Sequence, residues 1–201
     1  GSPAEEAGLK RGDWIIAANN KKIGSGDYSK YVSAPTQSYT FTLGNYNGEG
    51  FDTLGVTEIP APRYIEETNL MKTSFITAGN RTAAYILYNS FGADDTETLQ
   101  NMFVEIAARQ PNDIILDLRY NPGGYVSTSQ LLSTLLAPQN AMGQTFLNMT
   151  YNDKIAKTES YLFEPSLIPG GTPLAYENLY IITSNNTASA SEIVINCLRP
   201  Y

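Results

Sequence analysis

The chain has 201 residues and a formal net charge of −7 without any basic stripe, so its charge argues against a nucleic-acid partner. It contains no apolar run long enough to span a membrane and no targeting signal. It contains no histidine, which excludes Ser-His-Asp and Cys-His catalysis and the common histidine metal sites, and no metal or cofactor is predicted.

The segment from Ser2 to Ile23 is typical of a one-turn helix, a Gly-Asp turn and a strand. Its Ser-Pro-Ala, Ala-Gly-Leu and Gly-Asp steps resemble the second half of a PDZ domain. Residues 1–50 are therefore predicted to be a partial PDZ-like α+β domain. The loop that receives a peptide's C-terminal carboxylate in that family has no counterpart here, so a helix-turn-strand without a binding role is the alternative.

Residues 51–82 are predicted to form an extended connector. Pro60 and Pro62 disfavour regular structure there, and only Leu54–Ile59 has the composition of a strand.

Residues 83–201 alternate strand and helix patterns, which predicts a mainly parallel sheet with right-handed crossovers. In such sheets ligands bind outside the carboxyl ends of the strands. Strands are expected at residues 83–89, 113–119 and 179–183, and helices near residues 95–109, 126–137 and 188–198.

Residues 140–178 are predicted to be an insertion built around a hairpin, with its turn at Asn152-Asp153. An insertion near the ligand-binding edge of a sheet would serve as a lid or a substrate wall. A hairpin without a function is an equally good interpretation of the same residues.

Ser189 follows a predicted strand and turn and opens a predicted helix, where free N–H groups and the positive end of the helix dipole gather. A hydroxyl there can attack a carbonyl carbon while a neighbouring N–H binds the oxyanion. Ser189 and Glu192 also have the spacing of a capping box, and from spacing alone the cap is the commoner role. Without histidine, a catalytic serine would need a lysine or a carboxylate as its base.

The motifs Asp117-Leu-Arg-Tyr-Asn-Pro-Gly-Gly124 and Thr187-Ala-Ser-Ala-Ser-Glu-Ile193 resemble those of the C-terminal processing peptidases, also called tail-specific serine proteases. The resemblance implies a crotonase/ClpP-like α/β core with an attached PDZ domain. It also implies a serine endopeptidase that cleaves polypeptides near their C-termini through an acyl-enzyme, in the periplasm or cell envelope.

The resemblance implies that the nucleophile is Ser189, not Ser191, and that Gly123 or Gly124 acts with Ala190 to bind the oxyanion. We expect Ser189 and Gly124 to lie close together, with the Ser189 hydroxyl turned toward them and Thr187 or another residue capping the helix.

Asp117 and Arg119 point to the same face of a predicted strand. Because paired strand charges are usually structural, we expect them to pair with each other and not to act in catalysis.

The sequence departs from the family at the general base, which is a lysine beyond the serine. The chain ends at Tyr201, and none of its seven lysines matches that position. We therefore expect a piece of a longer peptidase, truncated at both ends and inactive by itself. The alternative is a non-catalytic module on the same fold that binds a peptide or another ligand.

Overall fold

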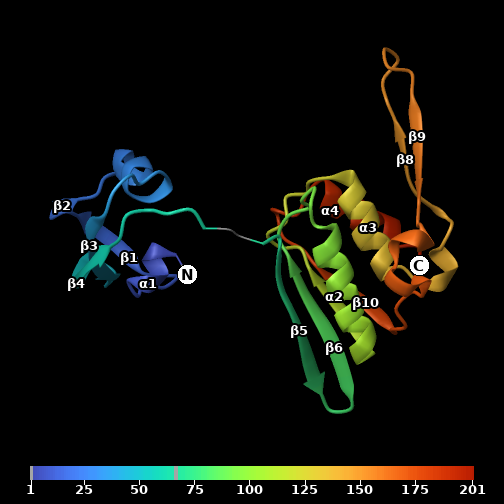
Figure 1. Ribbon diagram of the computed structural model, residues 1–201. Coiled ribbons are helices and arrows are strands. Elements are labelled where there is room, and N and C mark those ends of the chain that lie inside the picture. Colours follow the sequence, from blue (N-terminus) through green and yellow to red (C-terminus); the bar gives the residue numbers. More distant parts are fainter. Residues whose placement is uncertain (1, 66–67) are drawn as a thin grey trace. The chain divides into compact units, whose positions relative to one another are not determined.

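The computed structural model describes residues 2–65 and 68–201. It divides into two compact units, Gly1–Glu66 and Glu67–Tyr201, which are described separately (Figure 1).

The first unit is a small antiparallel sheet with short helices. Its strands follow the order β2-β1-β3-β4, and every neighbouring pair is antiparallel. Its small core is formed by Ala18, Tyr39 and Phe41. The elements are α1 (Pro3–Glu6), β1 (Trp14–Ala18), β2 (Lys21–Lys22), η1 (Ser25–Asp27), η2 (Ser29–Ser33), β3 (Tyr39–Tyr46) and β4 (Phe51–Ile59).

The region 51–82 differs from the predicted connector, because most of it belongs to the two sheets. Strand β4 (Phe51–Ile59) pairs with β3 and completes the first unit. Strand β5 (Leu70–Ala78) pairs with β6 in the second unit. Both strands lie at an edge of their sheet and are largely exposed, so hydrophobic periodicity did not reveal their length.

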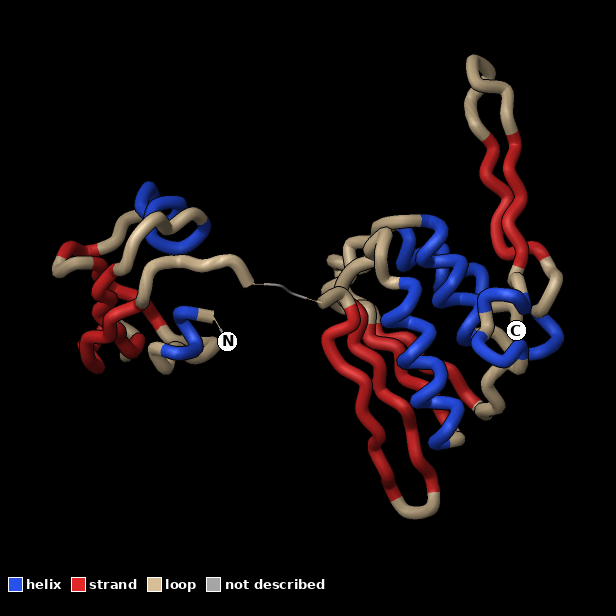
Figure 2. Tube along the Cα trace, viewed as in Figure 1, coloured by secondary structure: helices blue, strands red, loops and turns tan. Residues whose placement is uncertain are grey.

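The second unit contains the mainly parallel sheet that the sequence predicted. Its order is β10-β7-β6-β5, in which β10 (Asn178–Ile182), β7 (Asp113–Asp117) and β6 (Arg81–Tyr88) run parallel and β5 runs antiparallel at the edge. Figure 2 shows the strands of this unit in red and its helices in blue. The carboxyl ends of three parallel strands therefore meet at one edge.

Three helices cover one face of this sheet: α2 (Thr96–Arg109), α3 (Val126–Leu136) and α4 (Ala190–Leu198) (Figure 1). On that face Ala84 pairs with Ile114 and Ile86 with Leu116, and all four residues are fully buried. Apolar burial of this kind contributes about 25 cal/mol per Å² and holds the helix ends in fixed places beside the strand ends.

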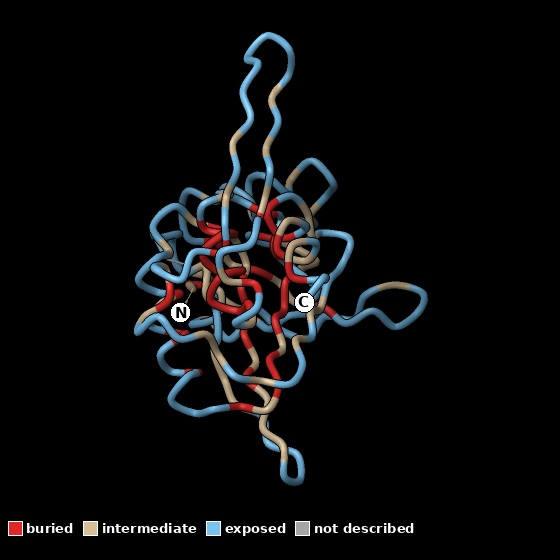
Figure 3. Tube along the Cα trace, turned by 90° about the vertical axis from the view of Figure 1, so that its right-hand side faces the viewer, coloured by how far each residue is buried: buried red, intermediate tan, exposed pale blue. Residues whose placement is uncertain are grey.

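The insertion contains the predicted hairpin, which projects as an exposed arm (Figure 3). Its strands are β8 (Thr145–Thr150) and β9 (Thr158–Leu162), and the flanking helical turns are η3 (Gln139–Ala141), η4 (Pro165–Leu167) and η5 (Pro169–Gly171).

The base of the arm is anchored near the end of α4 remote from Ser189. Phe146 and Phe163 are buried there with ring centroids 5.5 Å apart, and the Cys197 thiol donates to the Phe146 carbonyl (2.8 Å). The role of the arm as a lid or substrate wall stays a prediction. None of the helices in the described ranges 2–65 and 68–201 has the length and apolar character needed to cross a membrane.

Candidate active site

The turn between β7 and α3 carries the two glycines that the motif singled out. Gly123 is buried and has a φ of +110°, and Gly124 is exposed and has a φ of +143°. L side chains rarely adopt such backbone angles, so glycine suits both positions.

Gly124 is pressed against the loop that follows β6. A Cβ at Gly124 would lie 2.2 Å from the Phe91 carbonyl oxygen. Phe91 N–H donates to Gly123 O (3.0 Å), and Tyr125 N–H donates to Phe91 O (2.9 Å), so Phe91 clamps the glycine turn by its main chain.

The turn between β10 and α4 presents Ser189 at the N-terminus of the helix. Ser189 is exposed and has a φ of 56°, which is uncommon for a residue other than glycine. Such strain costs about 1–3 kcal/mol and is often found at functional sites.

The structure brings the two turns into contact. A Cβ at Gly123 would lie 2.6 Å from the Ser189 Cβ and 3.0 Å from both Ala188 O and Ala190 N. The predicted proximity of the serine and the double glycine is therefore present.

The main-chain N–H groups at the junction differ in their partners. Gly123 N–H donates to Asn121 Oδ1 (2.9 Å) and is occupied. Within residues 2–65 and 68–201, the N–H groups of Gly124 and Ala190 donate no hydrogen bond. Of the two glycines, Gly124 is the one whose N–H is available to an oxyanion, together with Ala190 at the positive end of α4.

Ser189 and Glu192 are placed as the two residues of a capping box, but the Ser189 hydroxyl forms no capping hydrogen bond. Ser189 N–H donates to Glu192 Oε2 (2.8 Å), and Glu192 N–H donates to the Ser189 carbonyl (2.8 Å). The helix end is thus closed without use of the hydroxyl.

Thr187 is not the alternative cap that the sequence suggested. Its Oγ1 accepts from Ser184 N–H (3.0 Å) and donates to the Leu118 carbonyl (2.8 Å). Thr187 closes the β10–α4 turn and ties it to the end of β7.

The second serine of the motif lies in a different environment from the first. Ser191 is fully buried, and its hydroxyl donates to the Asn121 carbonyl (3.1 Å). This difference favours Ser189 over Ser191 as the hydroxyl that can reach a substrate.

Asp117 and Arg119 form the predicted pair. Arg119 Nη2 lies 2.6 Å from Asp117 Oδ2, and the Tyr85 hydroxyl donates to the same oxygen (2.7 Å). Burial raises the pKa of Asp117, but the hydrogen bonds from Arg119 and Tyr85 outweigh it and hold that pKa below its ordinary value. The hydrogen bonds to the Asp117 carboxylate in turn raise the pKa of Arg119.

No lysine in the described ranges forms a hydrogen bond with the Ser189 hydroxyl. Four of the seven belong to the first unit, and Lys72 lies on β5. Of the two in the arm, Lys157 is paired with Glu159. Among residues 2–65 and 68–201 there is also no group of three or more acidic or cysteine side chains that could hold a metal ion.

The loop at residues 89–95 also supports the site, although no sequence motif marks it. Asp95, which directly precedes α2, accepts hydrogen bonds from the Tyr88 hydroxyl (2.6 Å), Gly92 N–H (2.8 Å) and Asn69 Nδ2 (3.0 Å). These bonds hold Phe91 against the glycine turn. The position of this loop after a parallel strand was the available signal.

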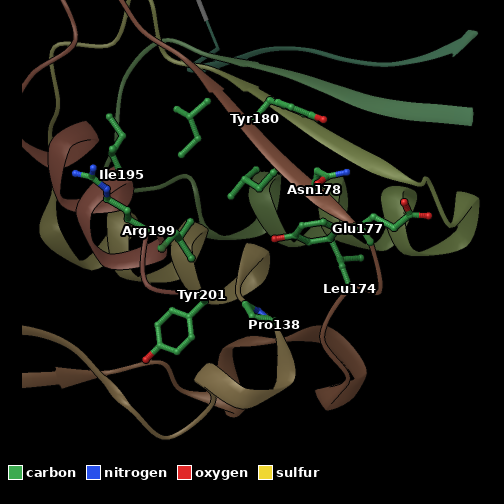
Figure 4. A pocket seen from close by; sticks show the side chains of 12 residues that line it. Pro138, Leu174, Glu177, Asn178, Tyr180, Ile195, Arg199 and Tyr201 are labelled. Carbon is green, nitrogen blue, oxygen red and sulfur yellow. The ribbon is translucent and has the colours of Figure 1, made fainter.

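Two surface hollows of the second unit lie away from Ser189. One, of about 600 Å³, follows the exposed edge strand β10 and is bordered by Tyr180, Ile195 and Tyr201 (Figure 4). The other, of about 620 Å³, lies beside α2. Neither is lined by Ser189 or by the two glycines.

A serine at a strained strand-to-helix turn, beside available main-chain N–H groups, can carry out nucleophilic acyl transfer if a base removes its proton. This is the chemistry of serine hydrolases. The observation that points to this class is the contact between the Ser189 turn and the glycine turn.

The chain belongs to peptidase family S41, whose profile matches residues 82–201. A PDZ-domain profile matches residues 1–38. A crystal structure of an S41 protease candidate from Bacteroides fragilis NCTC 9343 is similar at 34% identity with a TM-score of 0.82, covering 100% of this chain and 54% of that one.

Two curated relatives are named as carboxyl-terminal processing enzymes. The chloroplastic carboxyl-terminal-processing peptidase 3 of Arabidopsis thaliana is 27% identical over 99% of this chain and 38% of its own length. The carboxy-terminal processing protease CtpA of Bacillus subtilis is 24% identical over 99% and 39%. The chain thus spans about two-fifths of these relatives.

Substituting alanine at Gly123 should disrupt the junction. Its Cβ must displace the Ser189 turn, and overpacking together with backbone strain should cost about 3 kcal/mol or more. Gly79→Ala is the control for a positive φ without a steric clash, because Gly79 has a φ of +60° and no neighbouring atom within 4 Å, and it should cost only about 1–2 kcal/mol. Urea unfolding measures both losses, and equal losses would contradict the close approach.

Asp117 should stabilise the second unit except in acid. Because its folded-state pKa is lowered, its contribution is complete above the ordinary Asp pKa of about 3.9 and is lost as pH falls through the folded value. The stability of Asp117→Asn should therefore fall less steeply than that of the unchanged chain below about pH 5. Parallel acid-dependence curves for the two proteins would show that the pair contributes nothing.

Ser189→Ala should leave the melting temperature nearly unchanged, because the hydroxyl makes no capping bond. Thr187→Ala should lose about 1–2 kcal/mol, since two hydrogen bonds disappear. Thermal denaturation compares the two variants. A large loss at Ser189 with none at Thr187 would assign Ser189 to the cap.

Proposed function

We propose that this chain carries the nucleophile of a serine endopeptidase that cleaves polypeptides near their C-termini. The observation that carries the proposal is the contact between the Ser189 turn and the glycine turn, beside the available N–H groups of Gly124 and Ala190.

In the proposed mechanism Ser189 Oγ attacks the scissile carbonyl carbon and gives its proton to a base. The negative charge that develops on the carbonyl oxygen is received by the N–H groups of Gly124 and Ala190. One such donor is worth about 10²–10³ in rate. The amine leaves with the proton from the base, and water then hydrolyses the acyl-enzyme.

Gly123 has a different role in this proposal. Its N–H is used by Asn121, and its missing side chain lets the glycine turn touch Ser189. Gly123 thus supports the site by allowing close approach, and Gly124 supplies the donor.

We further propose that the base is a lysine outside these 201 residues. Within the described ranges the Ser189 hydroxyl is bonded to neither a lysine nor a carboxylate, and the Glu192 carboxylate is occupied by Ser189 N–H. Because a general base contributes about 10²–10⁴-fold, the 201-residue chain alone should not cleave protein detectably.

The substrate class and location follow the relatives. Carboxyl-terminal processing is the activity named for the Arabidopsis and Bacillus proteins, and we extend it to this chain. A periplasmic or cell-envelope location is part of the same proposal.

The Ser189 hydroxyl, which has no hydrogen-bond partner among residues 2–65 and 68–201, also fits a second function, a non-catalytic module that binds peptides or other ligands on the same fold. The discriminating feature is a lysine beside Ser189 in the full-length protein.

The test compares the full-length protein, its Ser189→Ala variant and the 201-residue chain with casein as substrate. We expect cleavage by the first only. A full-length protein that binds casein but does not cleave it would support the binding module. Ser189-dependent cleavage by the 201-residue chain would refute an external base and direct attention to Lys154 or Lys157.

A further inference from the structure

Asn121 lies at the junction of all three loops that leave the carboxyl edge of the sheet. It is fully buried, with 0% exposure. Its side-chain Nδ2 donates to the Tyr88 carbonyl at the end of β6 (3.0 Å), and its Oδ1 accepts from Gly123 N–H (2.9 Å). One side chain thus ties β6 to the glycine turn.

The main-chain carbonyl of Asn121 faces the other turn. It accepts hydrogen bonds from Ala188 N–H (3.3 Å) and from the Ser191 hydroxyl (3.1 Å). These donors lie immediately before and two residues after Ser189. The carbonyl therefore holds the serine turn from both sides of the proposed nucleophile.

We propose that Asn121 and Ser191 are positioning residues that set the place of the Ser189 hydroxyl relative to Gly124 N–H. The inference rests on the proposed function of Ser189. Neither residue touches the reacting atoms; both act through the main chain of the two turns.

The connection between the glycine turn and the serine turn runs through a single residue, Asn121. Asn121 Oδ1 holds the glycine turn, and Asn121 O holds the serine turn. One residue therefore positions both the Gly124 N–H and the Ser189 hydroxyl. By occupying Gly123 N–H, the Asn121 side chain also leaves Gly124 as the available donor of the pair. A displacement of about 1 Å in such a site can cost on the order of a hundredfold in rate.

Ser191→Ala tests this connection with little risk to folding, since it removes one hydroxyl from a buried position. Ser133→Ala is the matched control. Ser133 is also a fully buried helical serine, but among the described residues its hydroxyl has no hydrogen-bond partner. Removing it should be nearly neutral.

In the full-length protein we expect Ser191→Ala to lower kcat about tenfold to a hundredfold with KM unchanged, and Ser133→Ala to leave both values within about twofold. In the 201-residue chain, Ser191→Ala should accelerate hydrogen exchange at Ala188 N–H about fivefold to tenfold, because the loss of one hydrogen bond changes an opening equilibrium by about that factor. Ser133→Ala should leave this exchange rate unchanged. Equal kcat values and equal Ala188 N–H exchange rates in Ser191→Ala and Ser133→Ala would overturn the proposal.

Asn121→Asp is the second variant. Its carboxylate keeps an acceptor for Gly123 N–H but removes the donor to the Tyr88 carbonyl, so we expect the same fall in kcat. A normal kcat in a folded Asn121→Asp protein would overturn the role of the side chain, and if this variant does not fold, Ser191→Ala decides. If Ser189→Ala remains active, the proposed function of Ser189 is wrong. Hydrogen exchange at Ala188 N–H still tests whether Ser191 and Asn121 hold the serine turn.

Discussion

The candidate site depends on the close approach of two main-chain turns in which a side chain would not fit. An added Cβ would lie 2.6 Å from the Ser189 Cβ at Gly123 and 2.2 Å from the Phe91 carbonyl oxygen at Gly124. Real Cβ atoms are not found at such distances, so two consecutive glycines are a steric requirement. Their positive φ values are a second reason for glycine, because L side chains rarely adopt such backbone angles.

The parallel sheet is what brings these turns together. Leu87 of β6 and Ile182 of β10 are both in register with Asp117 of β7, so the three strands end at the same level. Their loops then continue side by side, linked by Leu118 N–H to Ile182 O (2.9 Å) and by the Phe91 clamp. Residues distant in the sequence meet because strand ends meet, a consequence of topology and register more than of any single contact.

The sequence was sufficient for the parallel strands, because each contains a short run of apolar, β-branched or aromatic residues, and for the two turns, because glycine and serine motifs follow those strands. It was insufficient for β4 and β5, since exposed edge strands are defined by pairing partners and lack a hydrophobic period. It also could not choose between Gly123 and Gly124. That choice depends on which N–H the Asn121 side chain accepts, a tertiary contact that no spacing encodes.

Ser189 itself is a residue that stability alone does not explain. Its φ of 56° would suit glycine better, and the strain persists because Glu192 binds its N–H while two helix N–H groups, from Glu192 and Ile193, hold its carbonyl. At Ser189 these bonds use only the main-chain N–H and carbonyl, so they do not require a serine side chain. What serine adds is a hydroxyl that forms no capping bond, presented at the contact with the glycine turn. A strained backbone whose side chain contributes nothing to the helix cap supports the proposal that Ser189 is the nucleophile.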